Sequence, residues 1–226
     1  MVRFIKYFRI LCKTIIFNFK VFPFKTAIKL PILISYKVKT DGLYKNCIEI
    51  NSDISRFMIK ININKPSIGV NCSTTEDGYL GISQGGKIIF TGKANFATGV
   101  SIRVDGGKLD IGNNFNSNGN CHFSCGDNVE IGNDVLLGWN VNIRTTDGHT
   151  IYNLDNPEIK TNENKPIIIG DHVWIASNVD ILKNVEIPEN CVVGYRSCVT
   201  RKFTEKNCII GGYPAKTIKR GINWEY

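Results

Sequence analysis

The chain has 226 residues, of which 42% are apolar, and a formal net charge of +8 at pH 7. This length is sufficient for one main domain with a substantial core and a small appendage. Residues 1–40 hold nine Lys and Arg and no acid, which leaves nineteen bases against twenty acids in the rest of the chain. Because the body is nearly neutral and has no stacking platform, no nucleic acid is expected as a partner.

Residues 1–41 form a basic segment that begins with the pattern of an amphipathic helix. Bases fall between apolar side chains at helical spacing, and these side chains are Phe4, Ile5, Phe8, Leu11, Cys12, Ile15, Ile16 and Phe19. Such helices lie on anionic membrane surfaces, so association of residues 1–22 with a membrane surface is one hypothesis. The alternative is a helix that packs on the end of the main domain or on a neighbouring subunit.

The basic interruptions argue against a secretory signal and against a membrane-spanning helix. The eight cysteines are therefore expected to be reduced thiols of a cytoplasmic protein, peripheral at the inner face of the membrane if the N-terminal helix binds there. No Cys-x-x-Cys pair occurs, so no metal site is predicted.

Residues 42–85 are expected to form irregular early coils or a cap, and a repeat with a period of six follows over residues 86–212. In its second half, two buried rows are predicted two residues apart. The first row is Val129, Val135, Val141, Val173, Val179, Val185 and Cys191. The second row is Ile131, Leu137, Ile143, Ile169, Ile175, Ile181, Ile187, Val193 and Val199.

A corner is predicted just before each residue of the first row. The residues there tolerate a left-handed backbone, and they are Asn128, Asp134, Asn140, His172, Asn178, Asn184 and Asn190. A helix cannot keep this pattern on one face, because six residues advance about 600° around its axis. A coil with three flat sides can keep it, and the sequence therefore predicts a parallel β-helix of the hexapeptide kind.

The six-residue period is interrupted once, over residues 144–166, by a polar loop. This loop begins with Thr145-Thr146-Asp147-Gly148-His149. A polar insertion of about twenty residues in a regular coil is uncommon unless it has a function. Residues 213–226 are expected to form a short terminal helix and a tail, because Pro214 is followed by helix-tolerant residues.

Three motifs within this repeat resemble the hexapeptide-repeat acyltransferases of the galactoside and maltose O-acetyltransferase type. They are the loop ending in Asp147-Gly148-His149, the phrase Ile-Gly-Asp-His-Val-Trp-Ile at 169–175, and the ending Gly-Gly-Tyr-Pro-Ala-Lys at 211–216. The resemblance is strongest over residues 85–221 and closest to the branch found in capsule, lipopolysaccharide and exopolysaccharide gene clusters. The fold class predicted is mainly β, a left-handed parallel β-helix with an N-terminal amphipathic helix and a short C-terminal helix.

The resemblance implies a homotrimer with active sites between subunits, acetyl-CoA as co-substrate, and direct acetyl transfer to a sugar hydroxyl. Direct transfer needs a general base, and an imidazole suits this role because its ordinary pKa lies near neutrality. His149, in the polar loop, is the predicted base, whereas His172 is expected to be structural and His122 is kept as an alternative. Asp147 is predicted to accept the other ring N–H of His149, unless it belongs to an ordinary Asp-Gly turn.

The remaining site residues follow from the motif match alone. Trp174 should point outward, beside the pantetheine end of CoA or in the trimer contact, and Asn118 matches an acceptor-binding Asn. A backbone amide near the thioester is expected from Ser177, a CoA track from Tyr195, Thr200 and Arg201, and contacts to the nucleotide phosphates from Lys216 and Lys219.

Three alternatives to sugar O-acetylation stay open. An amino-sugar N-acetyltransferase would use the same base and the same CoA groove. A zinc-dependent carbonic anhydrase on this fold needs clustered histidines, whereas His122, His149 and His172 are separated by more than twenty residues each. A non-catalytic trimeric scaffold is the last alternative, and the loop His149 together with Trp174 argues against it.

Overall fold

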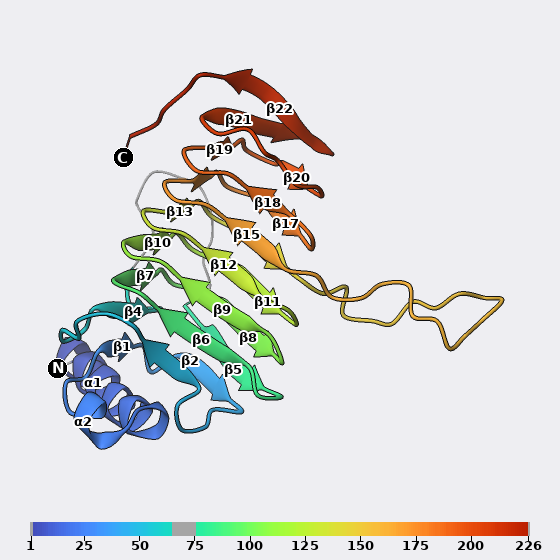
Figure 1. Cartoon of the computed structure of the whole chain (residues 1–226). Helices are drawn as coiled ribbons and strands as arrows, with labels where there is room; N and C mark the ends of the chain where they lie inside the picture. The colour runs from blue at the N-terminus through green and yellow to red at the C-terminus, as the bar shows by residue number, and fades with distance from the viewer. Residues whose placement is uncertain (1, 65–75, 226) are drawn as a thin grey trace.

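The computed structural model describes residues 2–64 and 76–225, so residues 65–75 of the predicted cap lie outside the described residues. Most of the described chain winds into a stack of three-sided coils, with an N-terminal helical cap and one long projecting loop (Figure 1). The predicted fold class, mainly β with a left-handed parallel β-helix, is confirmed.

The described strands form three sheets, one on each side of the coil. The first sheet runs in the order β1 (Ile32–Ile34), β4 (Ile59–Ile61), β7 (Ala94–Phe96), β10 (Phe115–Ser117), β13 (Leu136–Leu137), β16 (Trp174–Ile175), β19 (Val192–Val193), β21 (Cys208–Gly212) and β22 (Ala215–Arg220). The second runs β2 (Val38–Asp41), β5 (Gly78–Ser83), β8 (Ser101–Asp105), β11 (His122–Cys125), β14 (Asn142–Arg144), β17 (Asp180–Leu182) and β20 (Cys198–Val199). The third runs β3 (Ile48–Ile50), β6 (Lys87–Phe90), β9 (Lys108–Ile111), β12 (Val129–Ile131), β15 (Ile167–Ile169) and β18 (Glu186–Ile187).

Neighbouring strands within a sheet mostly differ by three in strand number, because each turn of the coil contributes one strand to each of the three sheets. The stack therefore begins at Ile32, well before residue 86, where the repeat was predicted to start. Both predicted apolar rows point inward and are buried. Phenylalanine rings pack against one another in the core of the early coils. The ring centroids of Phe96 and Phe115 are 5.0 Å apart, and those of Phe96 and Phe123 are 5.9 Å apart.

The predicted corners adopt the left-handed conformation at six of the seven positions, for example Asn178 (φ 59°) and Asn184 (φ 65°). Asn128 is the exception, because its φ is not positive. The preceding Asp127 instead accepts a hydrogen bond from the Asn128 amide, and this contact shapes that corner without a left-handed residue.

The helix α1 (Val2–Val21), followed by α2 (Phe24–Ala27), closes the N-terminal end of the stack (Figure 1). Asn18 and Thr14 are buried against the edge strand β1. The Asn18 amide donates to the Ile32 carbonyl at 2.7 Å, and the Ile34 amide donates to Thr14 Oγ1 at 3.1 Å. These side chains form hydrogen bonds with backbone N–H and C=O groups of the edge strand that could otherwise pair with a strand of another chain.

The predicted apolar stripe of α1 faces away from the stack. Seven of its eight members are exposed large hydrophobics, from Phe4 at 76% to Phe19 at 39%. A different face, which includes Ile10, Phe17 and Val21, packs inward. Among the described residues, no helix combines the length and the apolarity that a bilayer-spanning segment needs.

The predicted short C-terminal helix is wrong. Residues 215–220 form β22, which pairs antiparallel with β21, because the last strand of the stack offers an open row of backbone groups. The C-terminal tail then runs back along the stack to the corner between β15 and β16, where the Trp224 ring stacks on His172 with centroids 4.3 Å apart. His172 thus has a structural role at a left-handed corner (φ 53°).

Candidate active site

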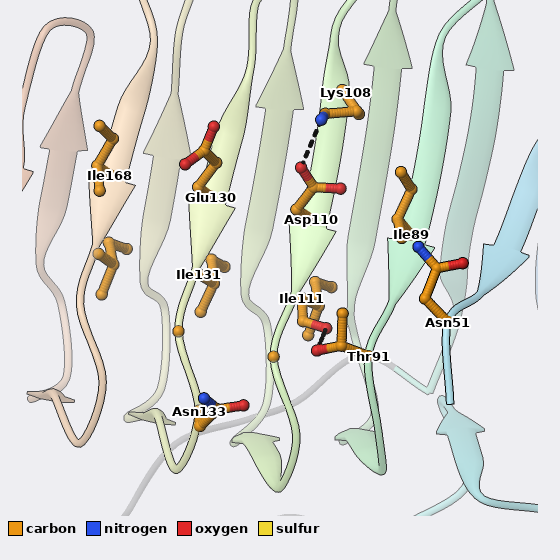
Figure 2. Close-up of a pocket in the computed structure, with 13 residues that line it drawn as sticks. Asn51, Ile89, Thr91, Lys108, Asp110, Ile111, Glu130, Ile131, Asn133 and Ile168 are labelled. Atoms are coloured by element: carbon orange, nitrogen blue, oxygen red, sulfur yellow. Dashed lines mark hydrogen bonds and ion pairs between the residues drawn. The ribbon is translucent and has the colours of Figure 1, made fainter. Parts of the chain in front are cut away.

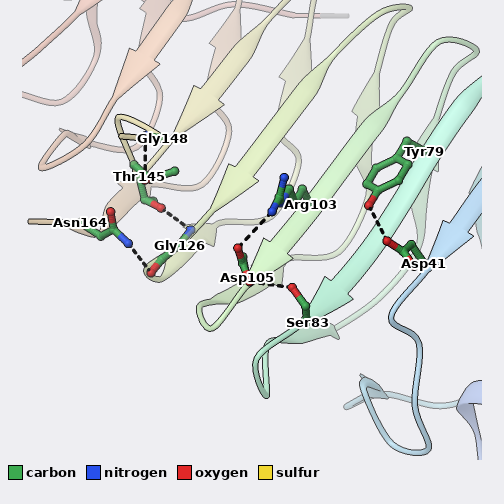
Figure 3. Close-up of polar contacts among 10 residues, drawn as sticks. Asp41, Tyr79, Ser83, Arg103, Asp105, Gly126, Thr145, Gly148 and Asn164 are labelled. Atoms are coloured by element: carbon green, nitrogen blue, oxygen red, sulfur yellow. Dashed lines mark hydrogen bonds and ion pairs between the residues drawn. The ribbon is translucent and has the colours of Figure 1, made fainter. Parts of the chain in front are cut away.

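The polar loop leaves the stack between β14 and β15 and projects far from the coils (Figure 1). Its root is fixed by Thr145, whose side chain is fully buried. Thr145 Oγ1 accepts hydrogen bonds from the amides of Gly126 at 2.9 Å and Asp127 at 3.0 Å. Asn164, at the returning end, donates to the Gly126 carbonyl at 3.0 Å (Figure 3). The loop therefore has a rigid base although its tip extends into solvent.

His149 is exposed on the loop, and its backbone is held by Asn162. The Asn162 side-chain amide donates to the His149 carbonyl at 2.7 Å, and its oxygen accepts from the Ile151 amide at 2.7 Å. Gly148 supplies the tight turn before the histidine with φ 81°. The imidazole is thus presented outward from a defined turn.

Asp147 has different partners from the one predicted. Its Oδ2 lies 2.5 Å from Lys183 Nζ and accepts a 3.0 Å hydrogen bond from the Asn162 amide. These contacts, with Lys183 the larger influence, lower the pKa of the Asp147 carboxyl. Asp147 therefore anchors the turn that carries His149, and no contact of the carboxylate with the His149 ring is found among the described residues.

Several of the predicted residues lie on two different edges of the coil. The corner between the second and third sheets, called the loop edge, carries His149, and Thr200 and Arg201 follow β20 on the same edge. The corner between the first and second sheets, called the opposite edge, carries Asn118 and Ser177.

On the opposite edge the corners of successive coils stack in register. The Asn118 amide donates to the Leu137 carbonyl of the next coil at 2.9 Å. One coil further, Ser177 Oγ accepts from the Trp139 amide at 3.0 Å, and Tyr195, 61% exposed, follows on the next corner. Predicted binding residues therefore lie on three of the four successive corners of this edge from Asn118 to Tyr195.

Trp174 lies on the outer face of the first sheet in the same coil as Ser177, and it is exposed as predicted. Its ring is 6.1 Å from that of Trp224, so the tail borders this face. Lys216 and Lys219 are exposed on β22 at the far end of the same sheet. One chain thus places His149 and the Trp174 face on different sides of the coil.

Of the hollows on the surface of the described residues, two bear on the choice of an acceptor site. One of about 380 Å³ on the second sheet adjoins the root of the His149 loop and is lined by Thr146 and Gly148. Another of about 470 Å³ on the third sheet is bordered by Ile89, Asp110 and Glu130, and no predicted site residue lines it (Figure 2). The first is the better candidate for an acceptor site because of its position beside the loop.

No group of three or more His, Cys, Asp or Glu side chains that could hold a metal ion is found in the described part of the chain. The motif match included Asp147 but did not identify Asn162 and Lys183, which fasten the loop with it. An Asn in a polar loop and a Lys after a strand carry no signal in a single sequence, because the contacts that they make are distant in the chain.

Comparison with known proteins gives the family. WbbJ of Escherichia coli K12, whose name assigns it to lipopolysaccharide biosynthesis as an O-acetyl transferase, is 32% identical over 137 residues, which are 56% of this chain and 69% of WbbJ. The chain belongs to the hexapeptide-repeat acetyltransferases. Several of its relatives belong to the capsule and lipopolysaccharide branch, and the protein is an acyltransferase.

This acetyltransferase is also 45% identical over 96 residues to the polysialic acid O-acetyltransferase of Neisseria meningitidis, with 42% of the chain and 44% of that enzyme covered. The match thus spans less than half of that relative. The crystal structure of the polySia-specific acetyltransferase NeuO has the same fold, with a TM-score of 0.61, 23% identity, and coverage of 86% of this chain and 78% of NeuO. No protein-family model matches the chain.

Proposed function

We propose that this protein transfers the acetyl group of acetyl-CoA to a sugar hydroxyl of a bacterial surface polysaccharide or its precursor. The observation that carries the proposal is the His149 turn, which is held by Asn162 and Asp147 at the root of the projecting loop. The names of WbbJ and of the meningococcal relative support a glycan acceptor.

In the proposed reaction, His149 takes the proton of the acceptor hydroxyl as its oxygen bonds to the acetyl carbonyl carbon. The bond between that carbon and the CoA sulfur breaks, and the proton is returned to the sulfur, so the products are an acetyl ester and the free CoA thiol. The Ser177 amide is the proposed donor for the charge that develops on the carbonyl oxygen. Trp174, Tyr195, Thr200, Arg201, Lys216 and Lys219 are the proposed CoA contacts, and Asn118 is a proposed acceptor contact.

A homotrimer is part of this proposal. Residues proposed for one site are divided between the loop edge and the opposite edge of a single chain, as His149 and Ser177 illustrate. Packing of three parallel coils side by side would bring the loop edge of one chain to the opposite edge of its neighbour. Each of the three sites would then contain residues from two chains.

We further propose that α1 holds the enzyme on an anionic membrane surface. The helix presents a solvent-exposed apolar face, and exposed bases such as Lys6, Arg9 and Lys20 flank it. Because the opposite face of α1 is already occupied by β1, the apolar stripe is available for a partner. The positive charge of the flanking bases matches the negative charge of an anionic lipid headgroup layer.

The proposal is tested by incubation of the purified protein with acetyl-CoA and a panel of oligosaccharides, with the products identified by mass spectrometry. Acetyl esters on hydroxyl acceptors are expected, whereas acetyl amides formed only on amino sugars would favour the N-acetyltransferase. Absence of acetyl transfer to every acceptor would contradict the proposed activity.

A further inference from the structure

The pocket beside the His149 loop is lined by two arginines and one carboxylate, that of Asp105. It lies on the outer face of the second sheet, and its volume of about 380 Å³ falls in the range of about 300–1,000 Å³ that is typical of small-molecule sites. Its floor includes Arg103, His122, Ser124 and Arg144. Thr146 and Gly148 of the loop root form one wall, so any occupant would lie next to the turn that carries His149.

The two arginines are aligned by the register of the sheet. Arg103 pairs with Ser124, and Ser124 pairs with Arg144, in three neighbouring strands. Both arginines therefore project from the same face, with Cα atoms two strand spacings or roughly 10 Å apart. Ser124 lies between them and offers a hydroxyl.

Arg103 is partly neutralised. Its guanidinium lies 3.3 Å from Asp105 Oδ2, and the other oxygen of Asp105 accepts a 2.6 Å hydrogen bond from Ser83 (Figure 3). At the loop root, Lys183 and Asp147 form an ion pair with each other at 2.5 Å.

Arg144 is compensated less directly, because it lies within electrostatic reach of Asp147, whose pKa its charge helps to lower. Its Nε is buried without a hydrogen-bond partner, and no carboxylate within the described residues forms an ion pair with it. A half-buried guanidinium whose Nε has no hydrogen-bond partner is costly unless an anion supplies the missing contact. The guanidinium fork also matches a two-oxygen anionic group, which it can bind with two parallel hydrogen bonds.

His122 adds hydrogen-bonding capacity without adding charge. Burial, and secondarily the charge of Arg144, lowers the pKa of His122, so its ring is neutral at neutral pH. The pocket therefore combines a cation that forms no ion pair among the described residues with neutral groups on His122, Ser124 and Asn164 that suit sugar hydroxyls.

We propose that this pocket binds an anionic sugar unit of the acceptor, with Arg144 paired to its carboxylate or phosphate and Arg103 as a second, weaker contact. The inference rests on the proposed function, because it assigns the acceptor class of the same site. An anionic unit bound here places the glycan at the loop root, beside His149. Neutral sugars would lack the group that Arg144 requires.

The test is calorimetric titration of the full-length protein without acetyl-CoA, so that it does not depend on activity. The probes are a tetramer of sialic acid, the same tetramer with its carboxylates reduced to alcohols, and N-acetylglucosamine with and without a 1-phosphate. Preference for the carboxylate or for the phosphate distinguishes the two sources of anionic charge. The variants are Arg144→Gln, Arg144→Lys and Arg103→Gln, and the matched control is Arg56→Gln, which removes one exposed charge at a distant corner.

Wild type and Arg56→Gln are expected to bind at least one anionic probe about tenfold to a hundredfold more tightly than its neutral partner, the range that a lost charged hydrogen bond gives. Arg144→Gln should abolish that preference, Arg144→Lys should retain part of it, and Arg103→Gln should weaken it less. The proposal is overturned if neither anionic probe is preferred by wild type, or if the preference persists in Arg144→Gln with an unchanged circular dichroism spectrum.

Failure of this inference and failure of the proposed function give different results. Acetylation of neutral and anionic glycans with equal efficiency would leave the acetyltransferase proposal standing and contradict the acceptor class. Preferential binding of an anionic probe without acetyl transfer to any acceptor would contradict the activity and leave the anion site standing.

Discussion

Lys183 and Asp147 are 36 residues apart in the sequence, yet Nζ of the lysine lies 2.5 Å from Oδ2 of the aspartate. This ion pair fastens the first turn of the projecting loop to the coil that follows it. Since Asp147 is two residues before His149, the pair also limits where the proposed base can lie. The pair is partly exposed, with side-chain exposures of 22% and 40%, so we expect its effect on position to exceed its effect on global stability.

Replacement of Lys183 by Met should raise the pKa of Asp147 toward its ordinary value. The native pKa is lowered, so the charged contact is intact above the ordinary pKa and is lost as the pH falls through the native pKa. The measurement is an NMR titration of the Asp147 carboxyl carbon. Lys202→Met, which removes the looser 3.5 Å pair with Glu186, is the control. An unchanged Asp147 titration in Lys183→Met would show that the pair does not hold the carboxylate.

Substitution of Asn162 by Ala should lower kcat for acetyl transfer by about tenfold or more, because the turn loses contacts to Asp147, His149 and Ile151. KM for acetyl-CoA should change little, since Asn162 is not among the proposed CoA contacts. Asn156→Ala, at the exposed part of the same loop, should keep its activity. Equal kinetics for the two variants would mean that the histidine turn does not need this anchor.

The corner at Asn184 offers a test of the repeat itself. A Val there should destabilise the fold by about 1–2 kcal/mol, because the left-handed backbone (φ 65°) tolerates Asn but crowds the two methyl groups on the Cβ of Val. A Gly at the same position should be tolerated. Denaturant unfolding measures both changes, and a fully stable Asn184→Val would argue against a left-handed corner.

The early coils should depend on their aromatic core. Phe96 is fully buried and has rings of Phe90, Phe115 and Phe123 around it. Truncation to Ala should cost about 3–5 kcal/mol of unfolding free energy. Phe24→Ala, at a ring that is 71% exposed, should stay within about 0.5 kcal/mol. Similar losses for the two variants would be inconsistent with this core.

Replacement of Phe4, Phe8 and Ile16 by Ser should abolish binding to vesicles that contain anionic lipids, while leaving the fold intact. Substitutions are preferable to deletion of α1, because Thr14 and Asn18 of this helix satisfy the edge of β1. Sedimentation with anionic and with neutral vesicles is the measurement, and Tyr213→Ser, at the other end of the stack, is the control. Unchanged sedimentation of the triple variant would refute membrane binding through this face.

The coil could be predicted because its signal is local and repeated, and the residues at both rows and at six corners lie as expected. The role of α1 could not be settled, since the sequence shows an apolar stripe but not that the other face, with Thr14 and Asn18, contacts β1. The terminal helix was wrong because pairing of β22 with β21 overrides weak local preference. The roles of Lys183 and Arg144 depend on contacts between coils, and that of Asn162 on contacts across the loop, and a single sequence reveals neither.

The most direct test of the central claim is the acceptor-dependent release of CoA thiol from acetyl-CoA by wild type, by His149→Ala and by His172→Asn. Wild type and His172→Asn are expected to release thiol at comparable rates, because Asn suits the left-handed corner at residue 172. His149→Ala should be slower by about a hundredfold or more, as expected for a lost general base. Retention of near wild-type release by a folded His149→Ala would contradict the assignment of His149 as the base.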